Sequence, residues 1–324
     1  MVHAIRQYEA GGPEKFKWEE VEVGEPGAGE VRLRQTAIGL NFIDIYQRTG
    51  LYPVPFPAIL GLEAAGVVEA VGPEVSALEA GDRVAYPSGP LGAYAEARLM
   101  PADQLAKLPE TIDDVTAAAM MLKGCTVEYL IRRSYPVQAG DTVLFHAAAG
   151  GVGLIACQWL KAIGATMIGT VGSEEKAALA RAHGCDHTIL YRSEDVAARV
   201  REITGGAGVP VVFDSVGAST FEASLDSLKP RGMLVSFGNA SGPVTDVDLG
   251  ILSAKGSLYV TRPTLFHYYA TPEDFAAGTR ALFDVVTSGE VKIEIGQTFA
   301  LKDTAEAHRA LEARRTTGST VLLP

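Results

Sequence analysis

The sequence contains few cysteines and no long apolar run. Three cysteines, Cys125, Cys157 and Cys185, are scattered among 324 residues, without a C-x-x-C pair. They cannot form a disulfide framework, and their small number is typical of a reducing compartment. The charge-free stretch 147–160 is too short to span a membrane. Because the first residues also lack the apolar core of a secretory signal, we expect a cytoplasmic protein without a membrane span.

Positive charge is also scarce. The chain has 28 Lys and Arg against 39 Asp and Glu, which gives a formal net charge of -11, and it has no basic run. Such a surface repels a phosphate backbone, so we expect no nucleic-acid partner. The remaining composition, 47% hydrophobic and 21% charged, is typical of a globular enzyme. A chain of this length predicts two domains.

Two kinds of catalytic site lack the residues that they need. No G-x-S-x-G elbow occurs, which leaves a serine hydrolase unsupported. The cluster 183–187 groups three possible His and Cys ligands, but a closed zinc site needs four ligands in a fitting geometry. Its place between a predicted helix and a predicted strand favours a turn, and we predict no metal site.

Strand-like and helix-like segments alternate after Asp141. Helical spacers such as 174–183 separate them, with Ser173 as the predicted N-cap and Gly184 as the stop. This rhythm predicts a doubly wound parallel sheet. The six strand-like runs are 142–147, 166–171, 187–191, 209–216, 232–237 and 257–261.

The chain on either side of this region has a different pattern. Residues 1–122 contain short strand-like pieces between Gly and Pro turns and are expected to be mainly β. Two helical patterns, 272–288 and 303–315, and a final strand follow residue 263. We expect them to return to the first domain. The predicted domains are therefore 1–122 with 264–324, and 123–263.

A glycine-rich turn follows the first predicted strand of the parallel sheet, in the sequence "HAAAGGVG". In such a turn one glycine lets the backbone approach a pyrophosphate, and another lets the helix pack on the strand. Gly150 and Gly153 suit these two tasks, while Ala148 replaces the usual first glycine. The helix that begins here would direct free amides at the phosphates. The pattern predicts dinucleotide binding.

The residues after the second predicted strand indicate which dinucleotide binds. An acid is expected there if the adenosine ribose carries a 2'-hydroxyl, but this chain has Gly172 and Ser173, with Lys176 one turn later. A hydroxyl and a cation suit a 2'-phosphate, which favours NADPH over NADH. Glu174 and Glu175 are interpreted as first-turn helix acids that point to solvent.

The run "PAILGLEAAGVV" places one carboxylate, Glu63, in an apolar setting. A buried carboxylate needs backbone donors or a cationic partner, because an unpaired one would take up a proton. The sequence does not identify this partner. Tyr46, Tyr52 and Tyr191 are further polar candidates, each equally compatible with a packing role.

The chain resembles a known family along its whole length. The similar segments include "AIGLNFIDIYQRTGLYP", "LGLEAAGVV", "LFHAAAGGVGLIACQW", "VSFGNASG" and "GSLYVTRP". They identify it as similar to the zinc-free quinone oxidoreductases of the medium-chain dehydrogenase/reductase superfamily, the zeta-crystallin group, and above all to bacterial NADPH:quinone oxidoreductases. The resemblance implies an α/β protein with a GroES-like, mainly β catalytic domain and a Rossmann cofactor domain.

The resemblance also bears on metal binding. Zinc-dependent relatives have Gly-His-Glu where this chain has Gly61, Leu62 and Glu63. Leucine cannot ligate zinc, and the cysteine ligand expected near 39–44 is missing too. The resemblance therefore implies that Glu63 is structural and that catalysis needs no metal.

The resemblance implies a cofactor in a cleft between the domains, and it assigns residues to each part of it. Asn41 and Tyr46 are implied as catalytic residues beside the nicotinamide, and Tyr52 as a substrate contact. The segment 266–269, with four aromatic side chains, departs from the bacterial pattern and is expected at the mouth of the active site. The implied cofactor residues are Asn41, Tyr46, Thr126, Gly150, Gly151, Val152, Gly172, Ser173, Lys176, Tyr191, Phe237, Gly238, Asn239 and Arg262.

Three functions remain open at this point. The first is hydride transfer from NADPH to a quinone, and the second is NADPH-dependent reduction of a 2-alkenal or enone. The third, a non-enzymatic RNA-binding or crystallin role, is disfavoured by the acidic charge. We also expect a homodimer, because the last strand of the parallel sheet, 257–261, is an edge without a lysine guard.

Overall fold

The alternating segments after Asp141 fold into a parallel six-stranded sheet in the computed structural model, which describes residues 1–324. The strand order is β11-β10-β9-β12-β13-β14, as expected for a doubly wound fold. All six predicted strands are present, and the predicted fold class is confirmed. The strands are β9 (Thr142–Phe145), β10 (Thr166–Val171), β11 (His187–Leu190), β12 (Val209–Asp214), β13 (Leu228–Ser236) and β14 (Tyr259–Thr261).

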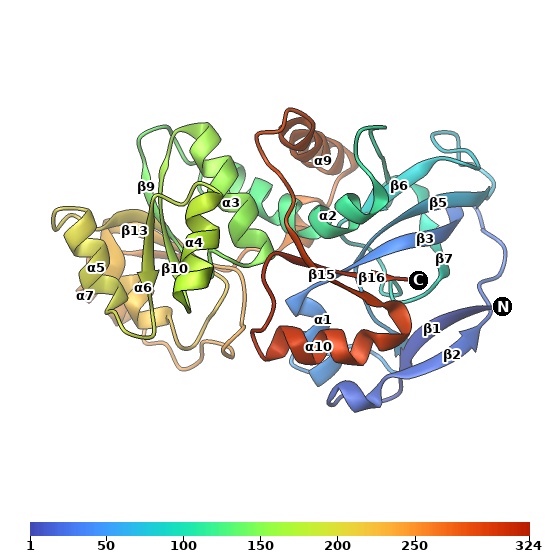
Figure 1. Cartoon of the computed structure of the whole chain (residues 1–324), viewed down its shortest axis with the longest axis horizontal. Coiled ribbons are helices and arrows are strands. Elements are labelled where there is room, and N and C mark those ends of the chain that lie inside the picture. Colours follow the sequence, from blue (N-terminus) through green and yellow to red (C-terminus); the bar gives the residue numbers. More distant parts are fainter. The chain divides into compact units, whose positions relative to one another are not determined.

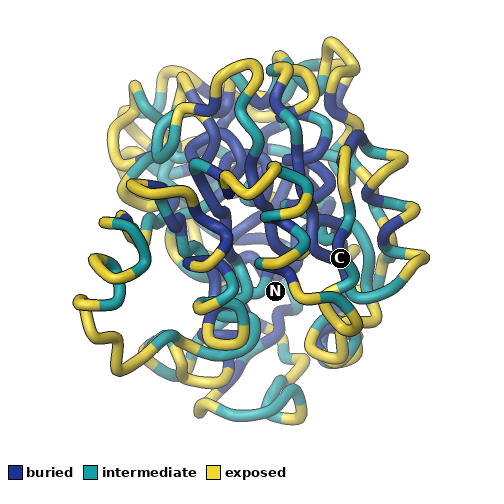
Figure 2. Tube along the Cα trace, turned by 90° about the vertical axis from the view of Figure 1, so that its left-hand side faces the viewer, coloured by how far each residue is buried: buried dark blue, intermediate teal, exposed yellow.

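This sheet belongs to the second of two units, which contains Thr126–Tyr268 and Ser288–Lys292. Leu144, Ile168 and Val212 on its central strands are fully buried among side chains of the helices. Figure 2 shows the buried chain inside and the exposed turns outside. The helices of this unit are the π-helical turn η3 (Leu130–Ser134), α3 (Gly151–Ile163), α4 (Glu174–Ala182), α5 (Val196–Ile203), α6 (Phe221–Ser227), α7 (Gly250–Ala254) and α8 (Leu265–Tyr268).

The first unit contains Met1–Cys125, Tyr269–Thr287 and Ile293–Pro324. One of its sheets has the order β2-β1-β4, and the other has β15-β16-β3-β5-β6-β8, with β7 paired to β3. The strands are β1 (Val2–Gln7), β2 (Lys17–Val21), β3 (Glu30–Leu40), β4 (Ala58–Ile59), β5 (Glu63–Val71), β6 (Arg83–Tyr86), β7 (Ala97–Pro101), β8 (Ala106–Lys107), β15 (Ile295–Ala300) and β16 (Ser319–Leu323).

This unit is mainly β, as its Gly and Pro turns predict. α1 (Phe42–Thr49) follows the long strand β3 directly and ends at Gly50, whose φ of 85° suits a glycine C-cap. α2 begins in this unit and continues into the second. The helices are η1 (Pro13–Lys15), α1, η2 (Ala102–Gln104), α2 (Asp114–Tyr129), α9 (Pro272–Thr287), η4 (Leu301–Asp303) and α10 (Thr304–Glu312).

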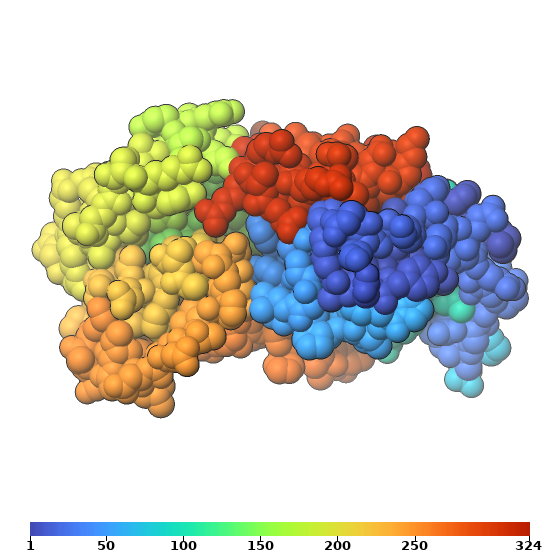
Figure 3. Space-filling model, turned by 90° about the horizontal axis from the view of Figure 1, so that it is seen from below, coloured from blue at the N-terminus to red at the C-terminus, as the bar shows by residue number.

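The end of the chain lies against its beginning within the first unit. β16 is antiparallel to β3, with Thr320 opposite Leu40. The Ser319 hydroxyl donates a hydrogen bond to the Ala119 carbonyl at 2.8 Å. Figure 1 shows β16 beside β3, and in Figure 3 the red C-terminal residues lie against the blue N-terminal ones.

Candidate cofactor site and the Glu63 network

The helix α3 begins at the glycine-rich turn with unused backbone donors. Its N-cap, Gly150, has no side chain to bond the first-turn amides, so those of 151–153 have no partner within the helix. A Cβ at Gly153 would lie 2.5 Å from the Ala147 carbonyl oxygen, which shows how closely helix and turn approach. The turn and its free amides fit a pyrophosphate. A side chain larger than that of glycine would not fit at Gly153.

The residues predicted around a 2'-phosphate lie together at the ends of β10 and β11. Val171 and Leu190 are paired, which places Gly172 beside Tyr191. A Cβ at Gly172 would lie 2.7 Å from the Tyr191 hydroxyl. Ser173 is the N-cap of α4 and accepts a hydrogen bond from the Lys176 amide at 3.3 Å. The Ser173 and Tyr191 side chains and the first turn of α4, which carries Lys176, therefore lie around the carboxyl ends of β10 and β11.

The acids next to this cluster are exposed. Glu174 and Glu175 occupy the first turn of α4, and Glu174 lies 3.9 Å from Arg181 on the same helix. Their exposure agrees with their interpretation as first-turn helix acids that point to solvent.

A third group of predicted residues follows β13. Arg262 donates hydrogen bonds to the Gly238 carbonyl at 2.9 Å and to the Ser236 hydroxyl at 3.1 Å. The Phe237 ring lies 5.8 Å from that of Phe145 on β9. A Cβ at Gly238 would lie 2.3 Å from the Ser215 carbonyl oxygen, so this loop packs directly on the turn after β12.

A buried polar network that the sequence does not predict lies beneath these loops. His146 Nδ1 lies 3.0 Å from the Thr170 hydroxyl, and its Nε2 lies 3.0 Å from the Ser224 hydroxyl. Ser224 donates to Asp214 at 2.8 Å. Burial lowers the pKa of His146 below its usual value, an effect that the Asp214 charge opposes. The only local signal is a histidine near the end of the first strand-like run, 142–147, where β9 has already ended at Phe145.

The predicted residues of the first unit lie on and after α1. Tyr46 is buried, and its ring packs edge-on against that of Tyr52 at 5.2 Å. The Tyr52 amide also donates to the Tyr46 carbonyl at 2.9 Å. Asn41 is the N-cap of α1. Thr126 lies in α2, in the second unit, with 7% exposure.

The partners of Glu63 are visible in the first unit. Its fully buried carboxylate is 2.9 Å from Lys123 Nζ and accepts hydrogen bonds from the Leu122 amide at 2.8 Å and from Asn41 Nδ2 at 2.7 Å. A Cβ at Gly39 would lie 2.1 Å from Glu63 Oε2. The network thus supplies both a cation and backbone and side-chain donors.

A second buried chain joins α1 to α10. Asp44 Oδ2 accepts hydrogen bonds from the Asn41 amide at 2.9 Å and from the Tyr94 hydroxyl at 2.7 Å, and that hydroxyl lies 3.0 Å from His308 Nε2. Burial raises the pKa of Asp44 to about 7, and the hydrogen bond from Tyr94 opposes this. Burial, together with the charge of Arg48, lowers the pKa of His308 well below its usual value.

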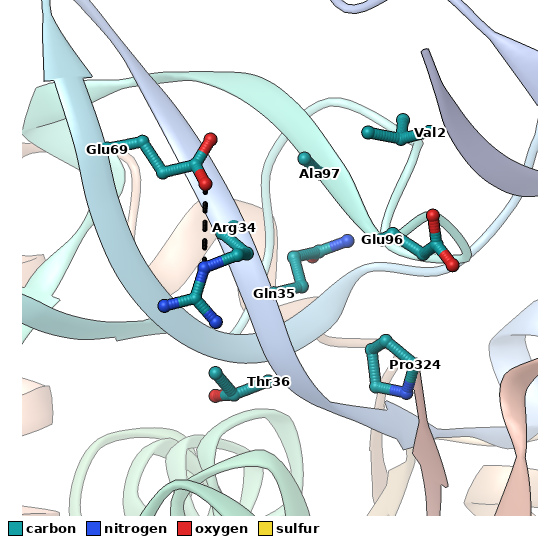
Figure 4. Close-up of a pocket in the computed structure, with 8 residues that line it drawn as sticks. All are labelled: Val2, Arg34, Gln35, Thr36, Glu69, Glu96, Ala97 and Pro324. Atoms are coloured by element: carbon teal, nitrogen blue, oxygen red, sulfur yellow. Dashed lines mark ion pairs between the residues drawn. The ribbon is translucent and has the colours of Figure 1, made fainter.

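Other features of the surface do not add to this site. A pocket of about 430 Å³ in the first unit is lined by Arg34, Glu69 and Pro324, among others, and by none of the predicted site residues. Figure 4 shows Arg34 turned toward Glu69, 3.4 Å away.

No group of three His, Cys, Asp or Glu side chains is placed to hold a metal ion. No helix is both long enough and apolar enough to cross a membrane.

The fold and the site define a class of protein: an α/β oxidoreductase that joins a GroES-like unit to a Rossmann-type unit. Residues 27–110 match the alcohol dehydrogenase GroES-like domain, and residues 151–282 match the zinc-binding dehydrogenase family. These two domains characterise the medium-chain dehydrogenase/reductase superfamily.

Comparison with individual proteins narrows the class. The chain is 60% identical to a quinone oxidoreductase of Pseudomonas aeruginosa, over the full length of both. It is 50% identical to a 2-haloacrylate reductase of Burkholderia, covering all of this chain and 99% of the other. A structure of Escherichia coli quinone oxidoreductase complexed with NADPH has a TM-score of 0.98 at 50% identity, covering 99% of this chain and all of the other. The chain belongs to the quinone oxidoreductase family.

Proposed function

We propose that this enzyme reduces quinones with NADPH by hydride transfer that requires no metal. The observation that carries the proposal is the placement of Ser173, Lys176 and Tyr191 after β10 and β11, next to β9, whose end leads into the open first turn of α3. Relatives named quinone oxidoreductase, and one of them in complex with NADPH, support both the substrate and the cofactor. When bound, NADPH supplies the hydride.

The residues of the second unit divide the binding of NADPH among them. The amides of Gly151 and Val152, after Gly150, hold the pyrophosphate at the positive end of α3. Ser173, Lys176 and Tyr191 hold the 2'-phosphate next to Gly172, with Lys176 as a charge-assisted donor. Phe237, Gly238 and Asn239, fixed by Arg262, line the nicotinamide, and so does Thr126.

The residues on α1 have different chemical roles in this proposal. Tyr46 donates its hydroxyl proton toward the oxygen on which negative charge develops, in place of a metal. Asn41 already donates to Glu63 and, at 3.4 Å, to the Gly39 carbonyl. Both protons of its side-chain amide are therefore used, and the side chain can only accept a further hydrogen bond. This suits contact with a donor on the cofactor better than contact with a quinone oxygen, which is itself an acceptor. Tyr52 packs on Tyr46 and contacts the substrate.

A second activity is supported by one relative. The 2-haloacrylate reductase, at 50% identity over the full chain, acts on a conjugated double bond by its name. Reduction of a 2-alkenal or enone by NADPH is therefore the alternative substrate class. The third possibility, an RNA-binding or crystallin role, is opposed by the net charge of -11.

A steady-state screen distinguishes these functions. NADPH oxidation is followed with benzoquinones, naphthoquinones, short 2-alkenals and 2-haloacrylate at matched concentrations. We expect the highest kcat/KM with quinones. A higher kcat/KM with the alkenals or haloacrylate would establish the alternative instead, and no turnover with any acceptor would contradict both.

We also propose that the enzyme is a cytoplasmic homodimer that pairs through β14. Tyr259 and Val260 on this edge strand are 58% and 42% exposed, and nearby Leu249 is 75% exposed. The orange segment with α7 and β14 forms part of the surface in Figure 3. Apolar side chains at an open strand edge suit an identical strand of a second copy. Three free, buried cysteines suit a reducing compartment.

A further inference from the structure

Five polar groups form a continuous buried chain under the loops of the second unit. The Ala147 amide donates to the Thr170 hydroxyl at 3.3 Å, and His146 lies between that hydroxyl and Ser224. Ser224 donates to Asp214 Oδ2. The side chains of Thr170, His146, Ser224 and Asp214 are at most 2% exposed, so no solvent competes with these bonds.

The direction of every hydrogen bond in the chain follows from its last member. A serine hydroxyl has one proton, and that of Ser224 goes to the Asp214 carboxylate. Ser224 can therefore only accept from His146, so the proton of the imidazole is on Nε2. Nδ1 is then an acceptor and takes the Thr170 proton, while the Thr170 oxygen accepts the Ala147 amide. Each donor in the chain has one acceptor, and the bonds all run toward Asp214.

The two ends of the chain hold two of the loops that carry the proposed cofactor contacts. At one end, Ala147 begins the glycine-rich turn with a φ of 58°, a left-handed conformation that costs free energy in a residue with a Cβ. At the other end, Asp214 also accepts from the amides of Val216 and Gly217, at 2.7 and 3.1 Å. The neighbouring Ser215 contacts the Gly238 loop, as described above.

We propose that His146, held as the Nε2–H tautomer between Thr170 and Ser224, positions the pyrophosphate turn relative to the loop that lines the nicotinamide. These are positioning residues: they act on NADPH through Ala147 and through the 214–217 turn. The inference rests on the proposed function, since it assigns the same cofactor site a supporting network. Removing one hydroxyl leaves the imidazole with a buried, unsatisfied nitrogen and frees the strained turn.

Two serines on α6 provide a matched test. Ser224 and Ser227 are both fully buried, but the Ser227 hydroxyl bonds only to the Ala223 carbonyl of its own helix. We expect Ser224→Ala to raise the Kd and KM for NADPH about tenfold, the effect of one lost buried hydrogen bond, with kcat at saturating NADPH within about twofold. Ser227→Ala should leave the Kd unchanged, even if both variants have a lower Tm.

A second pair keeps the test decisive if Ser224→Ala fails to fold. Thr170→Val removes the hydroxyl at nearly constant volume, whereas Thr170→Ser retains it, so NADPH affinity should fall in the first and recover in the second. The ring nitrogens of His146, assigned in 15N-histidine-labelled protein by comparison with His146→Gln, should show a neutral Nε2–H imidazole in the unmodified enzyme.

Three results would overturn the inference. An Nδ1–H tautomer of His146, or a charged ring at pH 7, would contradict the direction of the hydrogen bonds that run from Ala147 to Asp214. Equal Kd values in the two serine variants, with normal NADPH binding by the unmodified enzyme, would make the network merely structural and leave the proposed function intact. Failure of the unmodified enzyme to bind NADPH would remove the proposed function and this inference with it.

Discussion

At the scale of single residues, Lys123 is the group on which the buried charge of Glu63 depends. Both side chains are almost completely buried, and Lys123 is the cation that Glu63 contacts. We expect Lys123→Met to lower the free energy of unfolding by about 3–5 kcal/mol, because it leaves a carboxylate buried without its counter-charge. Urea unfolding followed by circular dichroism measures this loss.

A double variant separates lost packing from the uncompensated charge. Glu63→Gln combined with Lys123→Met removes both charges, and the amide can still accept from the Leu122 backbone. It should be more stable than Lys123→Met alone. If the double variant is instead as unstable as the sum of the two single variants, the pair is not coupled as described.

Asp44 should make stability depend on pH in an unusual direction. Its pKa is about 7 in the folded protein and 3.8 as an ordinary carboxyl, so between these values the folded state holds a proton that the unfolded state has lost. Stability due to Asp44 therefore falls as pH rises from about 4 to about 7, by at most about 1.4 kcal/mol per pH unit. Buried His308 has the opposite effect below pH 6.5, since only the unfolded chain protonates it there.

The Asp44→Asn variant isolates this effect, because an amide does not titrate and the histidine contribution cancels in the difference. We expect the unfolding free energy of Asp44→Asn minus that of the unmodified enzyme to increase steadily from pH 5 to pH 7. Guanidinium titrations at four pH values would measure it. A difference that stays constant over this range would show that Asp44 is ionised throughout.

At the scale of elements, the turn between β10 and α4 should decide which cofactor is used. Ser173 and Lys176 begin α4 there, Tyr191 lies beside Gly172, and only the 2'-phosphate of NADPH needs a cation. Lys176→Ala should raise the KM for NADPH about tenfold and leave that for NADH nearly unchanged, since a charge-assisted bond is lost with one cofactor only.

Arg181 provides the control for that experiment. It lies on the same helix and is half-exposed, but it bonds to Thr188 and lies near Glu174, and we assign it no cofactor contact. Arg181→Ala should change neither KM. If the unmodified enzyme uses NADH and NADPH equally well, the assignment of the 2'-phosphate pocket is wrong.

The elements also show what the sequence could predict. The six parallel strands and their helices follow from local patterns, because alternation and right-handed crossovers leave few other arrangements. Pairings between distant segments are different. Nothing near Thr320 indicates that it lies opposite Leu40, and the donors to Glu63 lie 22 to 60 positions away. The need for a partner was predictable, but the identity of the partner was not.

The residues of the candidate site also fall into a group that the sequence predicts and a group that it does not. The glycines and Ser173 have recognisable spacing because the backbone geometry of a phosphate turn demands small residues at fixed positions. His146, Thr170, Ser224 and Asp214 have no such spacing, since they meet only after β9, β10, β12 and α6 have packed. Tertiary packing, rather than any local pattern, assembles that network.

At the scale of the whole molecule, the proposed dimer depends on a short strand with three residues, β14. Its inner side pairs with β13, and its outer side has no partner within the chain. An open edge with exposed Tyr259 and Val260 would otherwise be available for uncontrolled association. Pairing with the same strand of a second copy satisfies the open amides and closes the assembly by two-fold symmetry.

The dimer can be tested with two substitutions at one position. Tyr259→Pro removes an amide donor, and edge strands tolerate proline, so the variant should fold but sediment as a monomer at micromolar concentration. Tyr259→Thr keeps the amide and the preference for a strand, and should remain dimeric. NADPH binding should survive in both, because the pyrophosphate turn follows β9 at the centre of the sheet whereas β14 is its edge. Sedimentation of the unmodified enzyme as a monomer, or an unchanged dimer in Tyr259→Pro, would place the interface elsewhere or remove it.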